Sequence, residues 1–86
     1  MKDNQKKYLD KVISLLVRDS IIDYDKAEIH LPFFKDPFYL SNIHFFTPSH
    51  LPPTVSRYCK NTYGIDGDEI KYVWVKYSVT IKEKIL

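Results

Sequence analysis

The stretch Tyr63-Gly64-Ile65-Asp66-Gly67-Asp68-Glu69-Ile70 marks a junction between two structural elements in the C-terminal third of the chain. Gly64 stands where a helix needs a left-handed C-terminal cap, because glycine takes that conformation without steric cost. Asp66 and Glu69 have the spacing of a capping box, and Ile65 and Ile70 have that of a hydrophobic staple. The stretch therefore predicts that one helix ends at Gly64 and that a second begins at Asp66.

The segment after the junction, residues 69–82, is compatible with two structures. A helix would place one apolar stripe on a single face, made of Ile70, Val73, Trp74, Tyr77, Ile81 and Ile85. A strand would use the alternation of Val73, Val75, Tyr77, Val79 and Ile81, after a turn at Asp66-Gly67. β-Branched residues each cost a helix about 0.5 kcal/mol, which keeps the strand open, but the capping signals favour the helix. We expect the part after Val79 to fray or to turn into a strand.

Two further helices are predicted upstream. Pro52 or Pro53 can occupy a first helical turn, and apolar residues follow at helical spacing, which predicts a helix over residues 52–63. Residues 4–18 have the pattern of an amphipathic helix, with Tyr8, Val12, Ile13, Leu15 and Leu16 set among charged side chains.

Strand-like sequence lies between these helices. Residues 21–31 predict two short strands about a polar turn near Asp25-Lys26. All five prolines fall within residues 32–53, together with many large apolar residues. Because proline restricts its own backbone and that of the preceding residue, only Tyr39–Phe46 is expected to form a strand there. Such an aromatic segment packs onto the core or forms an exposed patch.

The size and composition of the chain indicate one α+β domain over residues 1–86. The net charge of +2 is too small to indicate a nucleic-acid or membrane partner by itself. Cys59 has no second cysteine to pair with, and no apolar run is long enough to span a membrane, so we expect a cytoplasmic protein. The abundance of Lys, Ile, Tyr, Asn and Phe suits a bacteriophage or other virus, and AT-rich cellular genomes give the same bias.

The residues that could carry chemistry do not form a known catalytic or metal motif. His30, His44, His50 and Cys59 include good zinc ligands, but their spacing matches no compact zinc finger. Four acidic residues around the predicted hairpin could hold a divalent cation for a nuclease, although turn chemistry explains them more simply: Asp19, Asp23, Asp25 and Glu28. The only glycines are Gly64 and Gly67, too few for a phosphate-cradling loop. We therefore expect no enzyme, no metal and no cofactor.

The aromatic content points to a protein interface. A chain this small has limited interior, and Trp and Tyr are typical interface anchors. The candidate interface residues are Phe33, Phe34, Phe38, Tyr39, Tyr72, Trp74 and Tyr77, each of which is also a candidate for the core. The leading hypothesis is a small non-enzymatic accessory protein that binds a host protein or another copy of itself, as a homo-oligomer.

A second hypothesis is a DNA-binding regulator. The junction, with Val73 after it, resembles the turn of a helix-turn-helix in about twenty residues. Two features depart from that motif: Lys60 stands where a small residue is usual, and acidic residues begin the would-be recognition helix. If DNA is bound, the available cations are Arg57, Lys60, Lys71, Lys76 and Lys82.

Overall fold

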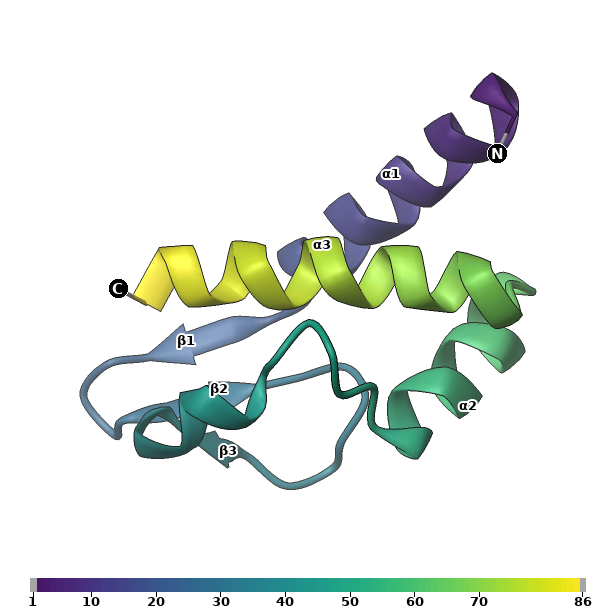
Figure 1. Cartoon of the computed structure of the whole chain (residues 1–86). Helices are drawn as coiled ribbons and strands as arrows, with labels where there is room; N and C mark the ends of the chain where they lie inside the picture. Colours follow the sequence, from purple (N-terminus) through teal and green to yellow (C-terminus); the bar gives the residue numbers. More distant parts are fainter. Residues whose placement is uncertain (1, 86) are drawn as a thin grey trace.

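The computed structural model describes residues 2–85, with only the backbone described for Phe45. It shows a single α+β domain (Figure 1). An N-terminal helix, a β-hairpin, an aromatic-rich central segment and two C-terminal helices follow one another as predicted, and a third strand joins the hairpin to make a sheet. In chain order the elements are α1 (Asp3–Arg18), β1 (Ile21–Asp23), β2 (Glu28–His30), β3 (Phe38–Tyr39), the 3-10 helix η1 (Leu40–Phe45), α2 (Pro53–Tyr63) and α3 (Gly67–Ile85).

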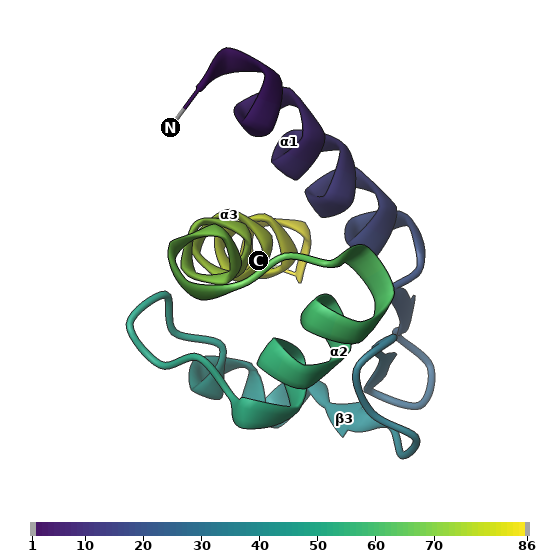
Figure 2. The same cartoon turned by 90° about the vertical axis from the view of Figure 1, so that its right-hand side faces the viewer.

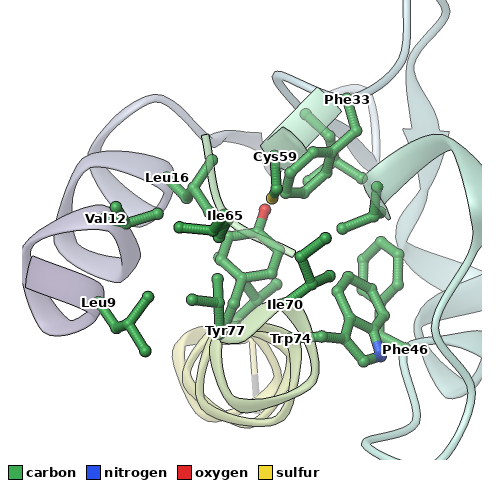
Figure 3. Close-up of a cluster of buried hydrophobic side chains, with 14 of the residues drawn as sticks. Leu9, Val12, Leu16, Phe33, Phe46, Cys59, Ile65, Ile70, Trp74 and Tyr77 are labelled. Atoms are coloured by element: carbon green, nitrogen blue, oxygen red, sulfur yellow. The ribbon is translucent and has the colours of Figure 1, made fainter. Parts of the chain in front are cut away.

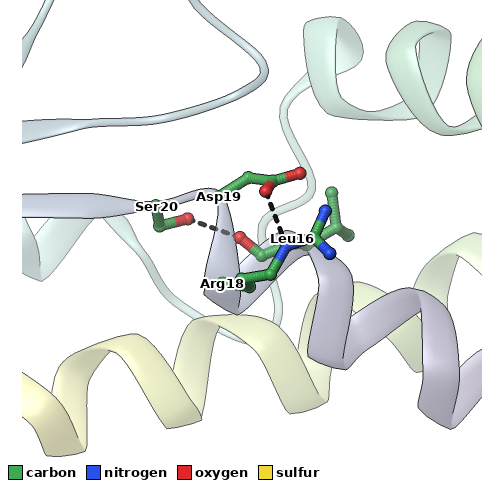
Figure 4. Close-up of polar contacts among 4 residues, drawn as sticks. All are labelled: Leu16, Arg18, Asp19 and Ser20. Atoms are coloured by element: carbon green, nitrogen blue, oxygen red, sulfur yellow. Dashed lines mark hydrogen bonds and ion pairs between the residues drawn. The ribbon is translucent and has the colours of Figure 1, made fainter.

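The first helix ends through local hydrogen bonds (Figure 4). The backbone N–H of Asp19 donates to the Leu15 carbonyl oxygen at 3.0 Å, and the Ser20 hydroxyl donates to the Leu16 carbonyl oxygen at 2.7 Å. Arg18 and Asp19 form an ion pair at 3.0 Å, with the Arg18 side chain largely exposed. The two hydrogen bonds to Leu15 and Leu16 satisfy carbonyls that a helix end leaves without partners, so the chain can turn directly into β1.

The three strands form an antiparallel sheet in the order β1-β2-β3. The predicted polar turn lies between β1 and β2, where the Asp23 carboxylate accepts from the Lys26 backbone N–H at 3.1 Å. Ile22, Ile29 and Phe38 are in register across the strands, and Ile29 is fully buried. Because successive residues of a strand point to opposite faces, this row faces the core and leaves the other face of the sheet to solvent.

The central segment contains less strand than predicted. The strand expected at Tyr39–Phe46 is wrong except at its first residue: β3 ends at Tyr39, and η1 follows with a kink at Asn42. The tighter coil lets Leu40 and Ile43 pack against the core. Phe46 is buried and stacks on Phe38, with ring centroids 4.6 Å apart. The sequence analysis also places Phe45 in this aromatic segment, but the Phe45 side chain lies outside the described part of the structure.

The junction after α2 has the predicted left-handed cap. Gly64 has φ of 64°, and its N–H donates to the Lys60 carbonyl oxygen at 3.1 Å. The capping box is only half formed: Glu69 Oε1 accepts from the Asp66 backbone N–H at 3.3 Å, but Asp66 Oδ1 accepts from the Gly67 N–H and not from that of Glu69. Ile65 is buried, as the predicted staple requires.

The segment after the junction is a helix, so the strand alternative is wrong. The predicted fraying after Val79 is wrong as well, because α3 continues to Ile85 and Ile81 is fully buried. Figures 1 and 2 show α3 between α1 on one side and α2 with the sheet and central segment on the other. The position of α3 between two layers accounts for its long apolar stripe. Each buried side chain of the stripe stabilises the fold by about 1.5–3 kcal/mol.

Candidate binding surface on helix α3

Three of the seven predicted interface aromatics lie in the core (Figure 3). Phe33, Trp74 and Tyr77 are 6%, 1% and 0% exposed, and the Phe33 ring meets those of both other residues edge-on. The Trp74 indole N–H donates to the Thr47 carbonyl oxygen at 2.9 Å. Side chains this buried offer almost no surface to a protein partner, so these three residues are removed from the predicted protein interface.

The other four aromatics do not gather at one place. Phe34 and Phe38 are half-buried and pack against the core. Tyr39 is 56% exposed and lies on the sheet face opposite Phe38. Tyr72 is half-buried on α3, where its hydroxyl donates to the Asp10 carboxylate of α1 at 2.9 Å and this hydrogen bond raises the pKa of the phenol. The aromatic surface predicted from sequence is therefore not formed as a single patch.

An apolar strip on α3 was missed by the sequence analysis. Val75 and Val79 are 40% and 39% exposed, one helical turn apart. Helical geometry places Tyr72 beside Val75 on the same side, opposite the buried stripe. We call Tyr72, Val75 and Val79 the α3 outer face. Figure 2, which looks along α3, shows α1 and α2 against other sides of this helix. The signal that could have found it lies on the helix face opposite the predicted apolar stripe. A face that contacts only water would carry polar residues, whereas this face carries two valines.

The predicted DNA-binding cations belong to two helices, α2 and α3. Lys71 and Lys76 are exposed on α3, with Lys76 Nζ 5.9 Å from the centroid of the Tyr72 ring and Lys71 Nζ 4.0 Å from Asp68. Lys82 is half-buried on the same helix. Arg57 and Lys60 are exposed on α2, where Arg57 borders a depression whose lining includes Phe33.

A groove of about 360 Å³ runs along the α1–α3 contact, next to the α3 outer face. It is lined by Lys6, Asp10, Ile13, Ser14, Tyr72, Lys76 and Thr80. The Ser14 and Thr80 hydroxyls donate to carbonyls of their own helices, and Asp10 accepts from Tyr72. The ammonium groups of Lys6 and Lys76 are left as its available donors, so the groove adds positive charge beside the strip.

Within residues 2–85 there is no cluster of metal ligands, and the thiol of Cys59 is not activated. No three His, Cys, Asp or Glu side chains of that range lie close enough together to hold a metal ion. Cys59 is fully buried, and burial raises the pKa of its thiol to about 11. A thiol with that pKa stays protonated at neutral pH and is a poor nucleophile. In the acidic cluster, Asp19 and Asp23 bind Arg18 and the Lys26 N–H respectively.

Among the described helices, none combines the length and the apolar character that crossing a membrane requires. Comparison with protein family models, with curated proteins and with solved structures found no match for this chain.

Proposed function

We propose that this chain is a small non-enzymatic accessory protein that binds a protein partner through the α3 outer face. The observation that carries the proposal is the exposure of Val75 and Val79 on a helix whose opposite side is core. Each valine costs a helix about 0.5 kcal/mol relative to alanine, so helix formation does not explain them. Core packing does not explain them either, since their side chains face solvent.

The charges around the strip define the chemistry of the partner. By the helical geometry of α3, Lys71 and Lys82 flank it on one side and Lys76 on the other, while Asp68 and Glu83 lie at its two ends. A second copy of the chain would bring like charges together across the strip, which is unfavourable. An amphipathic helix with an apolar stripe bordered by carboxylates would satisfy both the valines and the lysines, and we take this as the partner segment.

Site-specific photocrosslinking in the cells that encode the chain tests this proposal. A photoreactive residue at position 79 should give one dominant protein adduct, and the same residue at Tyr39, on the sheet face, should not. The double variant Val75→Lys/Val79→Lys should then weaken binding of the identified partner at least tenfold. It should leave stability within about 0.5 kcal/mol, because exposed positions tolerate substitution.

A matched control replaces two other exposed apolar residues. Ile21→Lys/Tyr39→Lys changes side chains that are 63% and 56% exposed on the sheet and should leave the affinity within about twofold. Adducts at position 39 without any at 79, or equal loss of binding in both double variants, would reject the α3 outer face. Light scattering tests self-association. If the wild type had the mass of a dimer and Val75→Lys/Val79→Lys that of a monomer, the partner would be a second copy of the chain and not a foreign protein.

DNA binding is the second candidate, and the helical structure on both sides of Gly64 favours it. The acidic start of α3 opposes it, since Asp68 is almost fully exposed where DNA phosphates would lie. The expected result, if DNA is bound, is salt-sensitive duplex binding that Lys71→Gln/Lys76→Gln abolishes. The absence of any mobility shift at low salt would exclude this function.

We also infer that the protein acts in the cytoplasm, which is the host cytoplasm if the gene is viral. The unpaired thiol of Cys59 supports this inference, because a reducing compartment keeps such a thiol free. Fractionation of a tagged full-length chain should recover it with cytosolic proteins, and recovery in a secreted or membrane fraction would contradict the assignment.

A further inference from the structure

We propose that a depression beside α2 binds a small aryl anion, meaning a planar aromatic ring that carries a carboxylate or a phosphate group. The depression has a volume of about 360 Å³ and is lined by Phe33, Thr54, Arg57, Tyr58, Asn61 and Thr62. We call it the α2 pocket. It shares no lining residue with the α1–α3 groove, so the inference stands independently of the α3 outer face.

The aromatic half of the ligand is inferred from the floor of the pocket. The Phe33 and Tyr58 rings are perpendicular, with an interplanar angle of 90° and centroids 5.4 Å apart. A third ring placed against two perpendicular rings can stack on one and meet the other edge-on, and both are favoured aromatic geometries. Phe33 is also held by an edge-on contact with the buried Tyr77, whose ring centroid lies 5.3 Å away. The floor is therefore preformed.

The anionic half is inferred from Arg57. The pocket lining contains this guanidinium and no carboxylate. Arg18 is paired with Asp19, whereas Arg57 makes no ion pair or hydrogen bond with any residue in 2–85. The lining of the α1–α3 groove, by contrast, includes the Asp10 carboxylate beside its two lysines. An uncompensated arginine beside an apolar floor favours a planar anion that its guanidinium can bind through two parallel hydrogen bonds.

The remaining polar groups of the pocket are free to orient such a ligand. Thr54, Tyr58, Asn61 and Thr62 are spaced at i, i+4, i+7 and i+8, which places them on one face of α2. Within the described part of the chain none of the four makes a side-chain hydrogen bond. The side chains around the α1–α3 groove differ, since the hydroxyls of Ser14, Tyr72 and Thr80 are already bonded within the protein.

The size of the pocket sets the size of the ligand. Its volume lies near the lower end of the roughly 300–1,000 Å³ typical of small-molecule sites. One ring with one anionic group fits such a volume, and probes with about ten non-hydrogen atoms should bind with a Kd on the order of 1 mM.

Nuclear magnetic resonance titration of the full ¹⁵N-labelled chain tests the proposal. Benzoate and phenyl phosphate should shift the amide signals of residues 54–62 and of Phe33 in a saturable way, and the tighter of the two identifies the preferred anion. Arg57→Gln should weaken the binding of either probe about tenfold, because it removes a charge-assisted contact. Arg57→Lys should recover only part of it, since a lysine lacks the planar fork.

Matched controls separate specific binding from general attraction. Lys60→Gln removes a neighbouring exposed charge of α2 that does not line the pocket and should change the affinity less than twofold. Benzyl alcohol and inorganic phosphate, each of which lacks one half of the ligand, should bind at least fivefold more weakly than phenyl phosphate. Equal binding of either half alone, an unchanged affinity in Arg57→Gln, or no saturable shift with either aryl anion would overturn the proposal.

Discussion

Tyr77 connects three parts of the fold through one side chain. The Ser20 hydroxyl has a single proton, which it donates to the Leu16 carbonyl oxygen, so the Tyr77 hydroxyl must be the donor to Ser20 Oγ. Its ring also lies edge-on to Phe33 of the central segment. A fully buried phenol with a hydrogen-bond acceptor is stable only in its protonated form.

This arrangement predicts how stability depends on alkaline pH. Burial raises the pKa of Tyr77 above its unfolded value near 10, so its contribution to stability is complete below pH 10 and is lost as the pH rises further. Tyr77→Phe should cost about 1 kcal/mol at pH 7 through the lost hydrogen bond. It should lose less stability than the wild type between pH 10 and 11.5, measured by urea unfolding. Parallel pH profiles for the two proteins would show that Tyr77 does not titrate on unfolding.

The buried Cys59 thiol is common to both proteins in that comparison. Its pKa is raised to about 11 from an ordinary value near 9, so it lowers the stability of both between pH 9 and 11. Only the difference between the two pH profiles therefore reports on Tyr77.

Ala27 has an unfavourable backbone conformation in the turn between β1 and β2. Its φ of 55° is a left-handed value that costs a residue with a Cβ about 1 kcal/mol or more. Ala27→Gly removes this cost but loses part of the gain to the larger entropy of an unfolded glycine, so we expect a net stabilisation of about 0.5 kcal/mol. Ala27→Val should destabilise by about 1 kcal/mol. Urea unfolding measures both, and a destabilised glycine variant would contradict the assigned strain.

At the scale of the elements, the junction between α2 and α3 depends on backbone conformation more than on packing. Gly64 is left-handed, and a Cβ added there would meet no atom within 4 Å. Gly64→Ala should therefore cost about 1 kcal/mol through its backbone alone, and Gly64→Asn should cost about half of that, because asparagine tolerates this conformation. Thermal unfolding should show a decrease in Tm of about 4–8 °C for alanine. Equal losses for the two variants would point to a contact other than the backbone.

The elements differ in how far the sequence determines them. The helices at 4–18 and 52–63 and the hairpin were predictable, because their periodicity and capping residues agree. The segment after Gly64 was ambiguous, because Val73, Tyr77 and Ile81 satisfy helical and strand periods at once. Burial between two layers decided it in favour of the helix. Tyr39–Phe46 was mispredicted because Leu40 and Ile43 reach the core only from a tighter coil, which strand propensity does not register.

The candidate sites were predictable only in part, because the sequence does not show on which face of the fold a side chain lies. Sequence identified Tyr72, Lys71, Lys76 and Arg57 as candidates, but it could not assign the first three to the α3 outer face and its border and Arg57 to the α2 pocket. Nor could it distinguish the core aromatic Phe33 from the exposed Tyr39, because both occur in the same proline-rich segment. Val75 and Val79 were missed because an exposed valine has no local signature until the face of the helix is known.

At the scale of the whole molecule, the core joins segments that are distant in sequence. Leu16 of α1, Phe46 of the central segment and Trp74 of α3 belong to one continuous cluster of buried side chains (Figure 3). The sheet has strands of only three, three and two residues, too short to be stable alone. The hairpin and central segment therefore depend on the helices for stability, and the helices depend on them to cover α3.

This shared core predicts that the whole chain unfolds as one unit. Leu16→Ala and Phe46→Ala should each cost about 3–4 kcal/mol, because both side chains are at least 98% buried. Far-UV circular dichroism reports on the helices and the fluorescence of the single tryptophan, Trp74, reports on the core. In each variant the two signals should change at the same urea concentration. Val79→Ala, on the α3 outer face, should stay within about 0.5 kcal/mol of the wild type. If Phe46→Ala lowered the fluorescence midpoint and left the dichroism midpoint unchanged, the sheet layer and the helices would be separate cooperative units, and the two layers would not stabilise each other.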